Sequence, residues 1–340
     1  MSEESNREDS PQVVLRRMIE GYRVSQLVYV AAELGLADLL KDGPRHYGEL
    51  ADASGTHPRS LFRLLRALCS VGIFTQLEGD RFELNPAAEL LRGDQAGSLR
   101  AWSIFTGSQH YAAWGHLLHS VKTGENAFDH AFGTKVWEYR KQNPAARRVF
   151  DQAISLRASL VSTAVVDAYD FSQFSRVVDV GGGAGVTLAA ILKANPAVRA
   201  VLFDLEQAVR AGEEHLKGVG LAERCEFVPG DFMEQVTAEG DGYILSRVLH
   251  DWGNGEATHI LKNCRAAMKT HQKVLIVERV VDADAPTAET ALGDISIMVI
   301  NGGCERTLAE FQTLLTNAGF EFTRVIPTRS LVQIVEAIAV

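Results

Sequence analysis

The chain has 340 residues, of which 46% are apolar and 23% charged, with 29 glycines and 9 prolines. This composition is typical of a globular protein and excludes collagen-like, coiled-coil and disordered chains, while the length predicts two domains. A formal net charge of −9 excludes bulk attraction to nucleic acid or to an anionic membrane, so we expect neither as a partner.

The four cysteines, Cys69, Cys225, Cys264 and Cys304, lack the spacing of a zinc site or a disulfide framework, and we interpret them as reduced, mostly buried thiols. Residues 1–12 are polar and acidic, which predicts a disordered tail without the pattern of a secretory signal. No apolar run reaches the ~18 residues that span a bilayer. The expected location is therefore cytoplasmic.

Residues 13–100 are predicted to form a separate module. Apolar residues at helical spacing predict a helix from Val13 to Leu34, and Gly35 is well placed to end it. Two more helices joined by a tight turn, followed by a β-hairpin, are expected over residues 47–53, 57–71, 74–77 and 81–84. Helix, turn, helix and hairpin in this order are typical of a winged helix.

A winged helix can bind DNA, and Arg59, Arg63 and Arg66 on its second helix would be the groove-reading residues. Residues 1–100, however, carry 12 Lys and Arg against 15 Asp and Glu, a net charge of −3. The same helix also has an apolar face of leucines. We therefore interpret the module as a packing or dimerisation unit and keep a DNA-binding regulator as the minor alternative.

Residues 101–165 are helical in pattern and rich in aromatic side chains. Most of these aromatics are expected in the core, and the others could line a pocket for a flat ring. The pair His116 and His119 has no carboxylate or third ligand at a suitable spacing, so we predict no metal there.

Residues 166–340 alternate short β-branched runs with helical patterns, which predicts a doubly wound α/β sheet. The last two strands are separated by four residues and should pair as an antiparallel hairpin at one edge, and helical patterns separate the first five. The predicted strands are Arg176–Val180, Ala200–Phe203, Cys225–Val228, Gly242–Leu245, Lys273–Val277, Glu321–Ile326 and Leu331–Ala337.

The first of these strands runs into a glycine turn that opens a helix. Its glycines follow the pattern G-x-G-x-G through Gly181, Gly183 and Gly185. Such a turn lets a ligand touch the backbone at a helix N-terminus and fits a dinucleotide or another adenosine-bearing cofactor. A dinucleotide site needs a third glycine where this chain has Val186, so the spacing favours the second class of cofactor.

Two further signals follow the next strands, where an open α/β sheet binds ligands. Asp204 ends the second strand, and its carboxylate could accept both hydroxyls of a ribose. Gly230-Asp231-Phe232-Met233 follows the third strand and offers an acceptor for an adenine amino group with apolar side chains for the ring faces.

These motifs resemble the S-adenosylmethionine-dependent O-methyltransferases typified by plant caffeate-type and bacterial antibiotic-type enzymes. The resemblance rests on Asp179–Gly185, Gly230–Phe232 and above all Leu249-His250-Asp251-Trp252. It implies an α/β, Rossmann-like doubly wound sheet with an antiparallel C-terminal edge hairpin, preceded by an all-helical winged-helix dimerisation domain. The domains it implies are a winged-helix dimerisation domain at 13–100, a helical connector lining the acceptor pocket at 101–165, and a methyltransferase domain at 166–340.

The resemblance also implies roles for single residues. His250 would be the general base, with Glu278 and Glu305 flanking it; Gly181 would approach the methionine part of the cofactor, and Asp204 its ribose. Ser246, with Arg247 beside it, stands where plant members have a lysine. The residues implied to bind the cofactor are Asp179, Gly181, Gly183, Gly185, Asp204, Leu205, Gly230, Asp231, Phe232, Ser246 and Arg247. Those implied to bind the acceptor are Trp114, Phe128, Phe132, Phe150, Ile154, Asp251, Met298 and Asn301.

The chemistry suits these residue types. Methyl transfer from a sulfonium is an in-line displacement, so the protein has to hold a hydroxyl near the methyl carbon and make its oxygen nucleophilic. Histidine, with an ordinary pKa of about 6.5, can take the hydroxyl proton near neutral pH, and a glutamate on its other nitrogen would fix the tautomer. No metal is required. Other readings remain: His250 as a core histidine, Asp251 as a helix cap, Glu278 as a surface carboxylate, and Glu305 as a residue favoured by a helix dipole.

The sequence thus predicts a homodimeric, metal-independent enzyme that moves a methyl group from S-adenosyl-L-methionine to a hydroxyl of an aromatic or polyketide-like molecule, releasing S-adenosyl-L-homocysteine. The alternatives are N- or C-methylation, non-methylating chemistry on the same fold, a nicotinamide oxidoreductase, and a winged-helix regulator.

Overall fold

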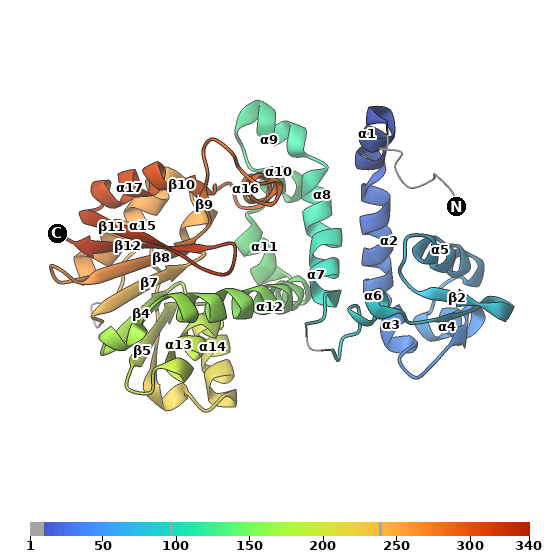
Figure 1. Cartoon of the computed structure of the whole chain (residues 1–340), viewed down its shortest axis with the longest axis horizontal. Helices are drawn as coiled ribbons and strands as arrows, with labels where there is room; N and C mark the ends of the chain where they lie inside the picture. The colour runs from blue at the N-terminus through green and yellow to red at the C-terminus, as the bar shows by residue number, and fades with distance from the viewer. Residues whose placement is uncertain (1–9, 96, 238–239) are drawn as a thin grey trace, which may run out of the picture. The chain divides into compact units, whose positions relative to one another are not determined.

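The computed structural model describes residues 10–95, 97–237 and 240–340. Within these ranges the chain divides into two compact units, coloured by residue number in Figure 1. The first unit comprises the chain up to Ala112 with Asn143–Ala153, and the second comprises Ala113–Gln142 with Ile154–Val340.

The first unit begins with two helices, α1 (Pro11–Glu20) and α2 (Tyr22–Glu33), where the sequence predicts one. Gly21 lies between them, and Gly35 follows α2 with a φ of 63°, which ends that helix before the short helix Leu36–Leu39 begins. Residues 1–9 of the predicted tail lie outside the described residues. Pro11 and Gln12, also assigned to the tail, instead form the start of α1, because proline is favoured in the first turn of a helix.

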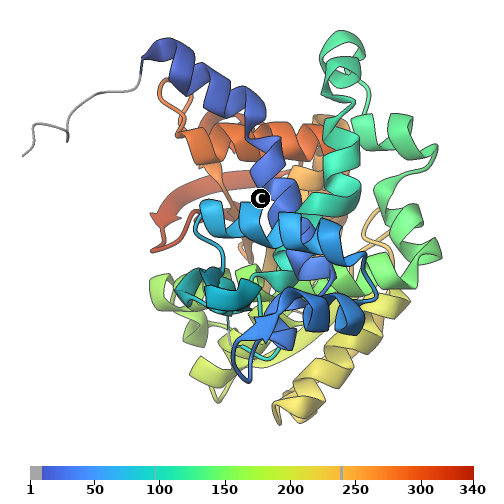
Figure 2. The same ribbon diagram turned by 90° about the vertical axis from the view of Figure 1, so that its right-hand side faces the viewer.

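The predicted winged helix is confirmed in this unit, which is coloured blue to cyan in Figure 2. It also contains a short strand that the sequence did not predict, so the module is not all-helical: the sheet order is β1-β3-β2. Its elements are α3 (Leu36–Leu39), β1 (Arg45–His46), α4 (Tyr47–Ser54), α5 (Pro58–Ser70), β2 (Thr75–Leu77), β3 (Arg81–Glu83), α6 (Pro86–Glu89) and α7 (Arg100–Phe105).

Helix α5 shows how the sequence specifies this unit. His57 caps its first turn by accepting from the N–H of Ser60 at 3.4 Å, and Pro58 follows as the first helical residue. The predicted apolar face is buried, since Leu61, Leu65 and Leu68 are at most 2% exposed. Their spacing of three and four residues places them on one side of the helix, which explains the packing.

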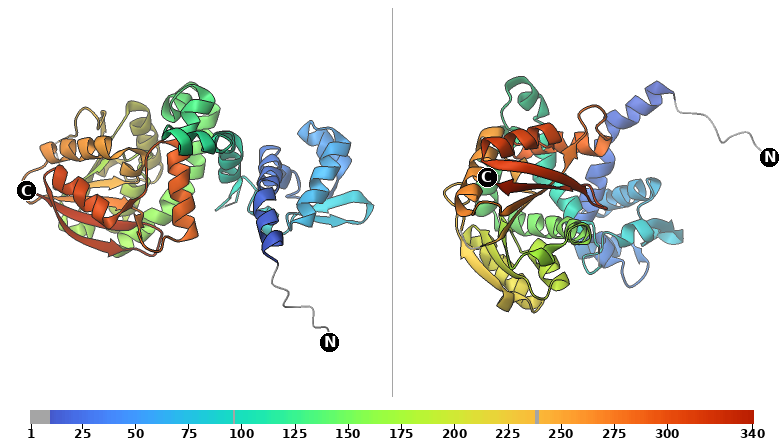
Figure 3. Two further views of the ribbon diagram at one scale, coloured as in Figure 1. Left: turned by 90° about the horizontal axis from the view of Figure 1, so that it is seen from above. Right: turned by 60° about the vertical axis from the view of Figure 1, so that its left-hand side comes forward.

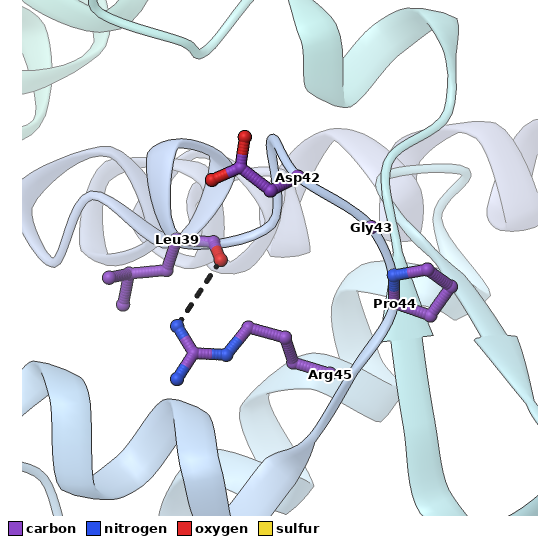
Figure 4. A pocket seen from close by; sticks show the side chains of 5 residues that line it. All are labelled: Leu39, Asp42, Gly43, Pro44 and Arg45. Carbon is purple, nitrogen blue, oxygen red and sulfur yellow. Dashed lines mark hydrogen bonds between the residues drawn. The ribbon is translucent and has the colours of Figure 1, made fainter.

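A polar hollow of about 340 Å³ lies where β1 follows α3 (Figure 4). The Arg45 guanidinium donates to the carbonyl of Leu39 at 3.4 Å, which links the two sides of this loop. The hollow is lined by Leu39, Asp42, Gly43, Pro44 and Arg45, none of which belongs to the predicted sites.

The region predicted as a helical connector is helical throughout much of its length. After a π-helical turn at Thr106–His110 come α8 (Tyr111–Trp114), α9 (Leu117–Thr123), α10 (Ala127–Phe132), α11 (Val136–Gln142) and α12 (Pro144–Ala168). By length and composition, α12 is the one helix among the described residues that could cross a membrane. Its C-terminal half packs on the sheet instead: Val165 is fully buried, and Ser162 shares a 3.1 Å hydrogen bond with Thr187.

The second unit contains a seven-stranded sheet of order β11-β12-β8-β7-β4-β5-β6. Its first five strands along the chain, β4 to β8, are parallel to one another. All seven predicted strands are confirmed, with small shifts at their ends. They are β4 (Arg176–Val180), β5 (Arg199–Asp204), β6 (Cys225–Pro229), β7 (Gly242–Ser246), β8 (Lys273–Glu278), β11 (Phe320–Pro327) and β12 (Gln333–Ala339).

Two expectations about the connections have different outcomes. The C-terminal edge hairpin is confirmed, because β11 pairs antiparallel with β12 and β12 with β8. The helical pattern between β6 and β7 is wrong: the described residues there form a short turn after Gly230. The carboxylate of Asp231 accepts from the N–H of Met233 at 2.8 Å within this turn.

Helices cover both faces of the sheet, as a doubly wound fold requires (Figures 1 and 3). Alternate strand residues divide between two cores: Val178 packs with α15 and α17, whereas Val177 packs with α12, α13 and α14. The helices and short elements of this unit are α13 (Val186–Ala194), α14 (Glu206–Gly218), α15 (Asn254–Ala267), α16 (Ala288–Ile300), α17 (Leu308–Asn317), β9 (Val280–Val281), β10 (Arg306–Thr307) and the turns Phe171–Gln173, Ala222–Arg224 and Leu249–Asp251.

The described cysteines are all free thiols. Cys225 and Cys264 are buried, and burial raises the pKa of each thiol to about 12. Cys69 and Cys304 are half-buried, so two of the four thiols are as buried as expected.

Candidate active site

The glycine turn after β4 has the conformation that its glycines allow. Gly181, Gly183 and Gly185 have φ values of 75°, 56° and 69°, and side-chain-bearing residues rarely adopt such angles. The N–H of Gly181 donates to the carbonyl of Phe203 at 2.8 Å, and that of Gly183 donates to Asp204 Oδ2 at 2.8 Å. The turn after β4 is therefore tied to the end of β5.

Space as well as φ requires glycine here. A Cβ on Gly181 would lie 2.8 Å from Val248 Cγ2, and one on Gly185 would lie 2.9 Å from Leu202 Cδ1. Gly183 differs, because nothing lies within 4 Å of its Cβ position. The turn is thus packed closely at both ends and open in its middle.

Asp179 lies beneath this turn and is 1% exposed. Neither carboxylate oxygen has a hydrogen-bond partner among the described residues, and a Cβ on Gly182 would lie 2.8 Å from the carboxylate. Burial, with the charge of Asp204 as a smaller cause, raises the pKa of Asp179 to about 7. A buried acceptor without a partner is costly in a folded chain, which points to a ligand that completes it.

The predicted adenine-binding residues follow β6 at the same edge of the sheet. The N–H of Gly230 donates to the carbonyl of Asp204 at 2.9 Å. The ring of Phe232 meets Trp252 edge to face at 6.0 Å, and its Cε1 lies 3.4 Å from the Cβ position of Gly181. The structure therefore brings the three predicted loops together. Leu205, predicted in the same set, is exposed.

Ser246 ends β7, and Arg247 follows it, three residues before the predicted base. Arg247 is a non-glycine residue with a φ of 57°, held there by the hydrogen bond from its N–H to the carbonyl of Val277 at 3.0 Å. Backbone strain of this kind is concentrated at functional sites.

His250 is buried in the turn Leu249–Asp251 that follows β7. Its Nδ1 lies 3.1 Å from Glu278 Oε2, without the alignment of a hydrogen bond, and 3.9 Å from Glu305 Oε2. The backbone N–H of His250 donates to Glu278 Oε1 at 3.3 Å. The predicted triad is thus brought together, and Nε2 is the ring nitrogen that faces away from the two glutamates.

A small pair of strands places the two glutamates. Glu278 ends β8, Glu305 precedes β10, and β10 pairs in parallel with β9 so that Arg306 lies opposite Val280. Glu305 therefore does not start a helix: α17 begins at Leu308, with Thr307 as its cap. The two segments, far apart in the sequence, run side by side toward the imidazole.

The charges of this cluster oppose its burial. Burial lowers the pKa of His250, but the charges of Glu278 and Asp251 outweigh it, so the pKa is raised. Burial likewise acts against ionisation of Glu278, yet the charge of His250 and the hydrogen bond from its backbone N–H leave the pKa of Glu278 lowered. Burial raises the pKa of Glu305. The geometry therefore favours an imidazolium paired with Glu278 and a more proton-binding Glu305.

The other nitrogen of His250 faces a second polar pair. Nε2 lies 3.3 Å from Asp251 Oδ1, and that oxygen accepts from the Asn301 amide at 2.8 Å. Burial raises the pKa of Asp251. Asp251 therefore links the base to Asn301 and is not a helix cap, because α15 begins at Asn254 after Gly253.

Four of the eight predicted acceptor residues gather in one aromatic cluster of the second unit. Phe128 stacks on Phe132 with ring centroids 4.4 Å apart, and Met298 and Trp114 pack against the same cluster. Asn301 follows α16, the helix that carries Met298. Phe150 belongs to the first unit and contacts Phe105 at 5.6 Å, and Ile154 begins the next part of α12.

The histidines around His119 have a different environment from the predicted site. His119 stacks on His130 with ring centroids 3.8 Å apart and pairs with Glu125 at 3.1 Å, in an exposed group without convergent ligand atoms. His250, Glu278 and Glu305, by contrast, have ligand atoms within 4.8 Å of one another, the one such group found among the described residues.

Sequence reasoning did not single out Arg306. Its buried guanidinium donates to the carbonyls of Leu249 and Trp252 at 2.8 and 2.6 Å, on either side of His250. The only signal in the sequence is its place directly after Glu305.

Comparison with known proteins adds to this geometry. The O-methyltransferase domain family matches residues 114–321, and the O-methyltransferase dimerisation domain family matches residues 17–94. The phenazine O-methyltransferase PhzM of Lysobacter antibioticus is 45% identical over 325 residues, covering 95% of each chain. The crystal structure of LaPhzM matches with a TM-score of 0.93 and 43% identity, covering 97% of this chain and 99% of that one. The O-methyltransferase NcsB1 of neocarzinostatin biosynthesis, in complex with S-adenosylmethionine and 2-hydroxy-5-methyl naphthoic acid, matches with a TM-score of 0.85 and 34% identity, covering 93% and 96%.

Proposed function

Because the chain belongs to the O-methyltransferase family that carries its own dimerisation domain, we propose that it methylates a hydroxyl of a flat aromatic or polyketide-like molecule with His250 as general base. It is an S-adenosylmethionine-dependent O-methyltransferase, which sets aside the nicotinamide oxidoreductase and the DNA-binding regulator. Its dimerisation domain makes it a homodimer. The observation that carries the proposal is the imidazole of His250 beside two buried glutamates at the ligand-binding edge of the sheet.

The residues after β4, β5 and β6 fit the cofactor of this family, S-adenosyl-L-methionine. Gly181 and Gly183 would let its methionine part approach the backbone, and the unpartnered carboxylate of Asp179 would balance its positive charge. Asp204 would hold the ribose, and Asp231 with Phe232 the adenine. When bound, the cofactor supplies a methyl group on a sulfonium, and S-adenosyl-L-homocysteine is the product.

Ser246 and Arg247 are the candidates for the cofactor carboxylate. Arg247 carries the positive charge that such a contact needs. Its backbone, with a φ of 57°, sets the direction in which its side chain leaves the chain. Its positive charge also opposes protonation of His250, which keeps more of the base neutral.

His250 would take the hydroxyl proton at Nε2. Glu278 on the Nδ1 side would fix the tautomer and stabilise the imidazolium, as the carboxylate of a catalytic triad does. Asp251 and Asn301 lie beside Nε2 and would orient the hydroxyl oxygen toward the methyl carbon. The neutral ring is the active form, and such a base contributes typically ~10²- to 10⁴-fold to the rate.

The aromatic cluster formed by Trp114, Phe128, Phe132 and Met298 would contact the acceptor rings. Flat side chains suit a flat acceptor, because ring faces stack with favourable geometry. Two relatives support a fused ring system: one is named for phenazine, and NcsB1 was solved with a naphthoic acid. We propose the cytoplasm as the place of reaction, since the described cysteines are free thiols.

Product analysis tests the proposal. The purified dimer is incubated with ¹³C-methyl-labelled S-adenosylmethionine and a hydroxyphenazine, a hydroxynaphthoic acid or a simple phenol. Mass spectrometry detects the product, and NMR of the labelled methyl group locates it. We expect an O-methyl product that forms fastest with a fused-ring acceptor. A methyl group on nitrogen or carbon, or no transfer to any hydroxyl, would overturn the proposed reaction.

A further inference from the structure

The turn that carries His250 is held by one side chain from another segment. Arg306 is 1% exposed, and its guanidinium donates to the carbonyl of Leu249 at 2.8 Å and to that of Trp252 at 2.6 Å. Its Nε also donates to Asn254 Oδ1 at 2.9 Å. Three donors of one planar fork thus bind the residues before and after His250, which fixes the turn in two directions.

Gly303, a second residue of the segment that carries Arg306, packs directly against the backbone of the His250 turn. The Cβ position of Gly303 lies 2.0 Å from the carbonyl oxygen of His250 and 2.6 Å from the backbone carbon of Asp251. Only glycine lets the two backbones approach this closely. Gly303 and Arg306 stand on either side of Glu305, so the segment that supplies the glutamate also holds the histidine turn.

The segment itself is fixed by the strand that carries the other glutamate. Arg306 pairs with Val280 in the β10–β9 ladder, two residues after Glu278. The N–H of Glu305 also donates to Asp294 Oδ1 at 2.7 Å. Glu278, Glu305 and the turn of His250 therefore share one rigid connection that runs through Arg306.

We propose that Arg306 is a positioning residue of the reaction: it holds the imidazole of His250 against Glu278 and Glu305 and so sets the direction of Nε2. The inference rests on the proposed role of His250 as base. Arg306 donates to backbone carbonyls rather than to the catalytic side chains, so its effect on turnover passes through the placement of His250. A shift of about 1 Å in a reacting group can lower a rate ~10²-fold.

Another arginine of the same unit provides a matched control. Arg224 also donates to several backbone carbonyls, among them those of Asn195 at 3.0 Å and Val198 at 3.3 Å, but it holds a loop away from His250. Arg306→Met and Arg224→Met both remove a carbonyl-binding guanidinium. Only the first should change the environment of the base.

The main measurement is the titration of the His250 ring by NMR in protein labelled with ¹³Cε1-histidine and saturated with S-adenosyl-L-homocysteine. His250→Gln assigns the signal, and no acceptor is needed. The charged groups that face the ring are Glu278 from β8, Glu305 before β10, Asp251 of its own turn and Arg247 at the end of β7. We expect the midpoint of Arg306→Met to fall by at least ~0.5 pH unit toward the ordinary value of about 6.5, because the ring leaves the glutamates. In Arg306→Lys, which has one donor group for three acceptors, the midpoint should fall part of the way. In Arg224→Met the midpoint should match that of the wild type.

Turnover with the fastest acceptor of the panel gives the second measurement. Arg306→Met should lower kcat at least ~10-fold with S-adenosyl-L-homocysteine affinity unchanged, and should lower it no further in a His250→Gln background. An unchanged midpoint in the folded Arg306 variants, or an equal further loss in the double variant, would overturn the inference. If Arg306→Met does not fold, Arg306→Lys decides by the same two measurements. Full activity of His250→Gln would instead refute the base itself, whatever the Arg306 variants do.

Discussion

The glycine turn and the His250 cluster lie at the same edge of one sheet but are built from different material. The turn presents backbone: Gly181 and Gly183 have positive φ, and their N–H groups bind the end of β5. The cluster presents side-chain charge, with one imidazole between two buried carboxylates. A side chain added in the glycine turn should therefore weaken cofactor binding without changing the charges of the cluster. A charge removed from the His250 cluster should lower turnover without changing cofactor binding. The comparison predicts a division between cofactor affinity and turnover.

The largest effect is expected from the cluster. His250→Gln keeps the size of the side chain but removes the base, so kcat should fall at least ~10²-fold while the affinity for S-adenosyl-L-homocysteine stays within about twofold. Stopped assays with labelled cofactor and calorimetry measure the two quantities. His119→Gln, which changes another histidine paired with a glutamate, should leave both unchanged. Loss of affinity together with kcat would break the division between the two regions.

The turn should show the opposite behaviour. Gly181→Ala places a methyl group 2.8 Å from Val248 at a φ of 75°, so we expect the dissociation constant of S-adenosyl-L-homocysteine to rise at least ~10-fold. At saturating cofactor, kcat should change little. Gly183→Ala is the control, because it has a similar φ but open space around its Cβ. Equal losses in the two variants would mean that contact with Val248 does not decide affinity.

The same difference explains what the sequence could predict. Adjacent residues specify the glycine turn. A β-branched run specifies β4, and the closely spaced glycines after it allow the positive φ values of the turn. His250 and Glu278 were predicted from the family resemblance, and the place of Glu278 at a strand end favoured that role. Arg306 and Leu249 are 57 residues apart, so no local pattern reports their hydrogen bond.

Other parts depended on tertiary packing. Phe128 and Phe150 are both aromatic residues of helices, yet one joins the cluster of the second unit and the other packs on Phe105. Periodicity gives the face of a helix and not the neighbour of that face. The segment between β6 and β7 was expected to be helical, yet its described residues form a turn at Asp231.

A smaller effect should come from one carboxylate of the cluster. The pKa of His250 is raised, so kcat should rise with pH through a midpoint above ~6.5, as the ring becomes neutral. Glu278→Gln removes the charge that raises it, so the midpoint should move to lower pH and kcat at its plateau should fall about 10-fold. Two acceptors with different phenol pKa values separate this midpoint from ionisation of the acceptor.

The stability of the same variant has a defined sign. A raised pKa of His250 means that the charged pair stabilises the folded chain below ~6.5 and that this contribution is lost as pH rises through the folded pKa. Glu278→Gln should therefore lower the Tm more at pH 6 than at pH 9. Glu305→Gln is the matched control, because Glu305 lies 3.9 Å from Nδ1 of His250, farther than Glu278 at 3.1 Å. Identical pH profiles of the two variants would show that the glutamates are equivalent.

Asp179 lies beneath the glycine turn, and its ionisation should affect both stability and cofactor affinity. Its pKa of about 7 lies far above the ordinary value of 3.8, so the folded chain loses stability as pH rises from about 4 to about 7, and the loss is complete above that range. Asp179→Asn should raise the Tm of the cofactor-free protein at pH 8 and change it less at pH 5. It should also weaken binding of S-adenosyl-L-methionine several-fold at pH 8, because a charge-assisted contact is lost. Unchanged affinity would mean that Asp179 only packs beneath Gly182 and does not interact with the cofactor.

The smallest effect is expected from chelation. His250, Glu278 and Glu305 have ligand atoms within 4.8 Å, close enough for a divalent cation. Arg279 Nε, however, lies 4.0 Å from Glu305 Oε1, and the charge of Arg247 acts on the same three residues, so the local field opposes a second cation. A proton on the imidazole balances the charge of Glu278 without a metal. Dialysis against EDTA should leave kcat within about twofold, with a chelator-treated His250→Gln sample as the baseline; a loss restored by Mg²⁺ or Zn²⁺ would turn the cluster from a charge-balanced base into a metal centre.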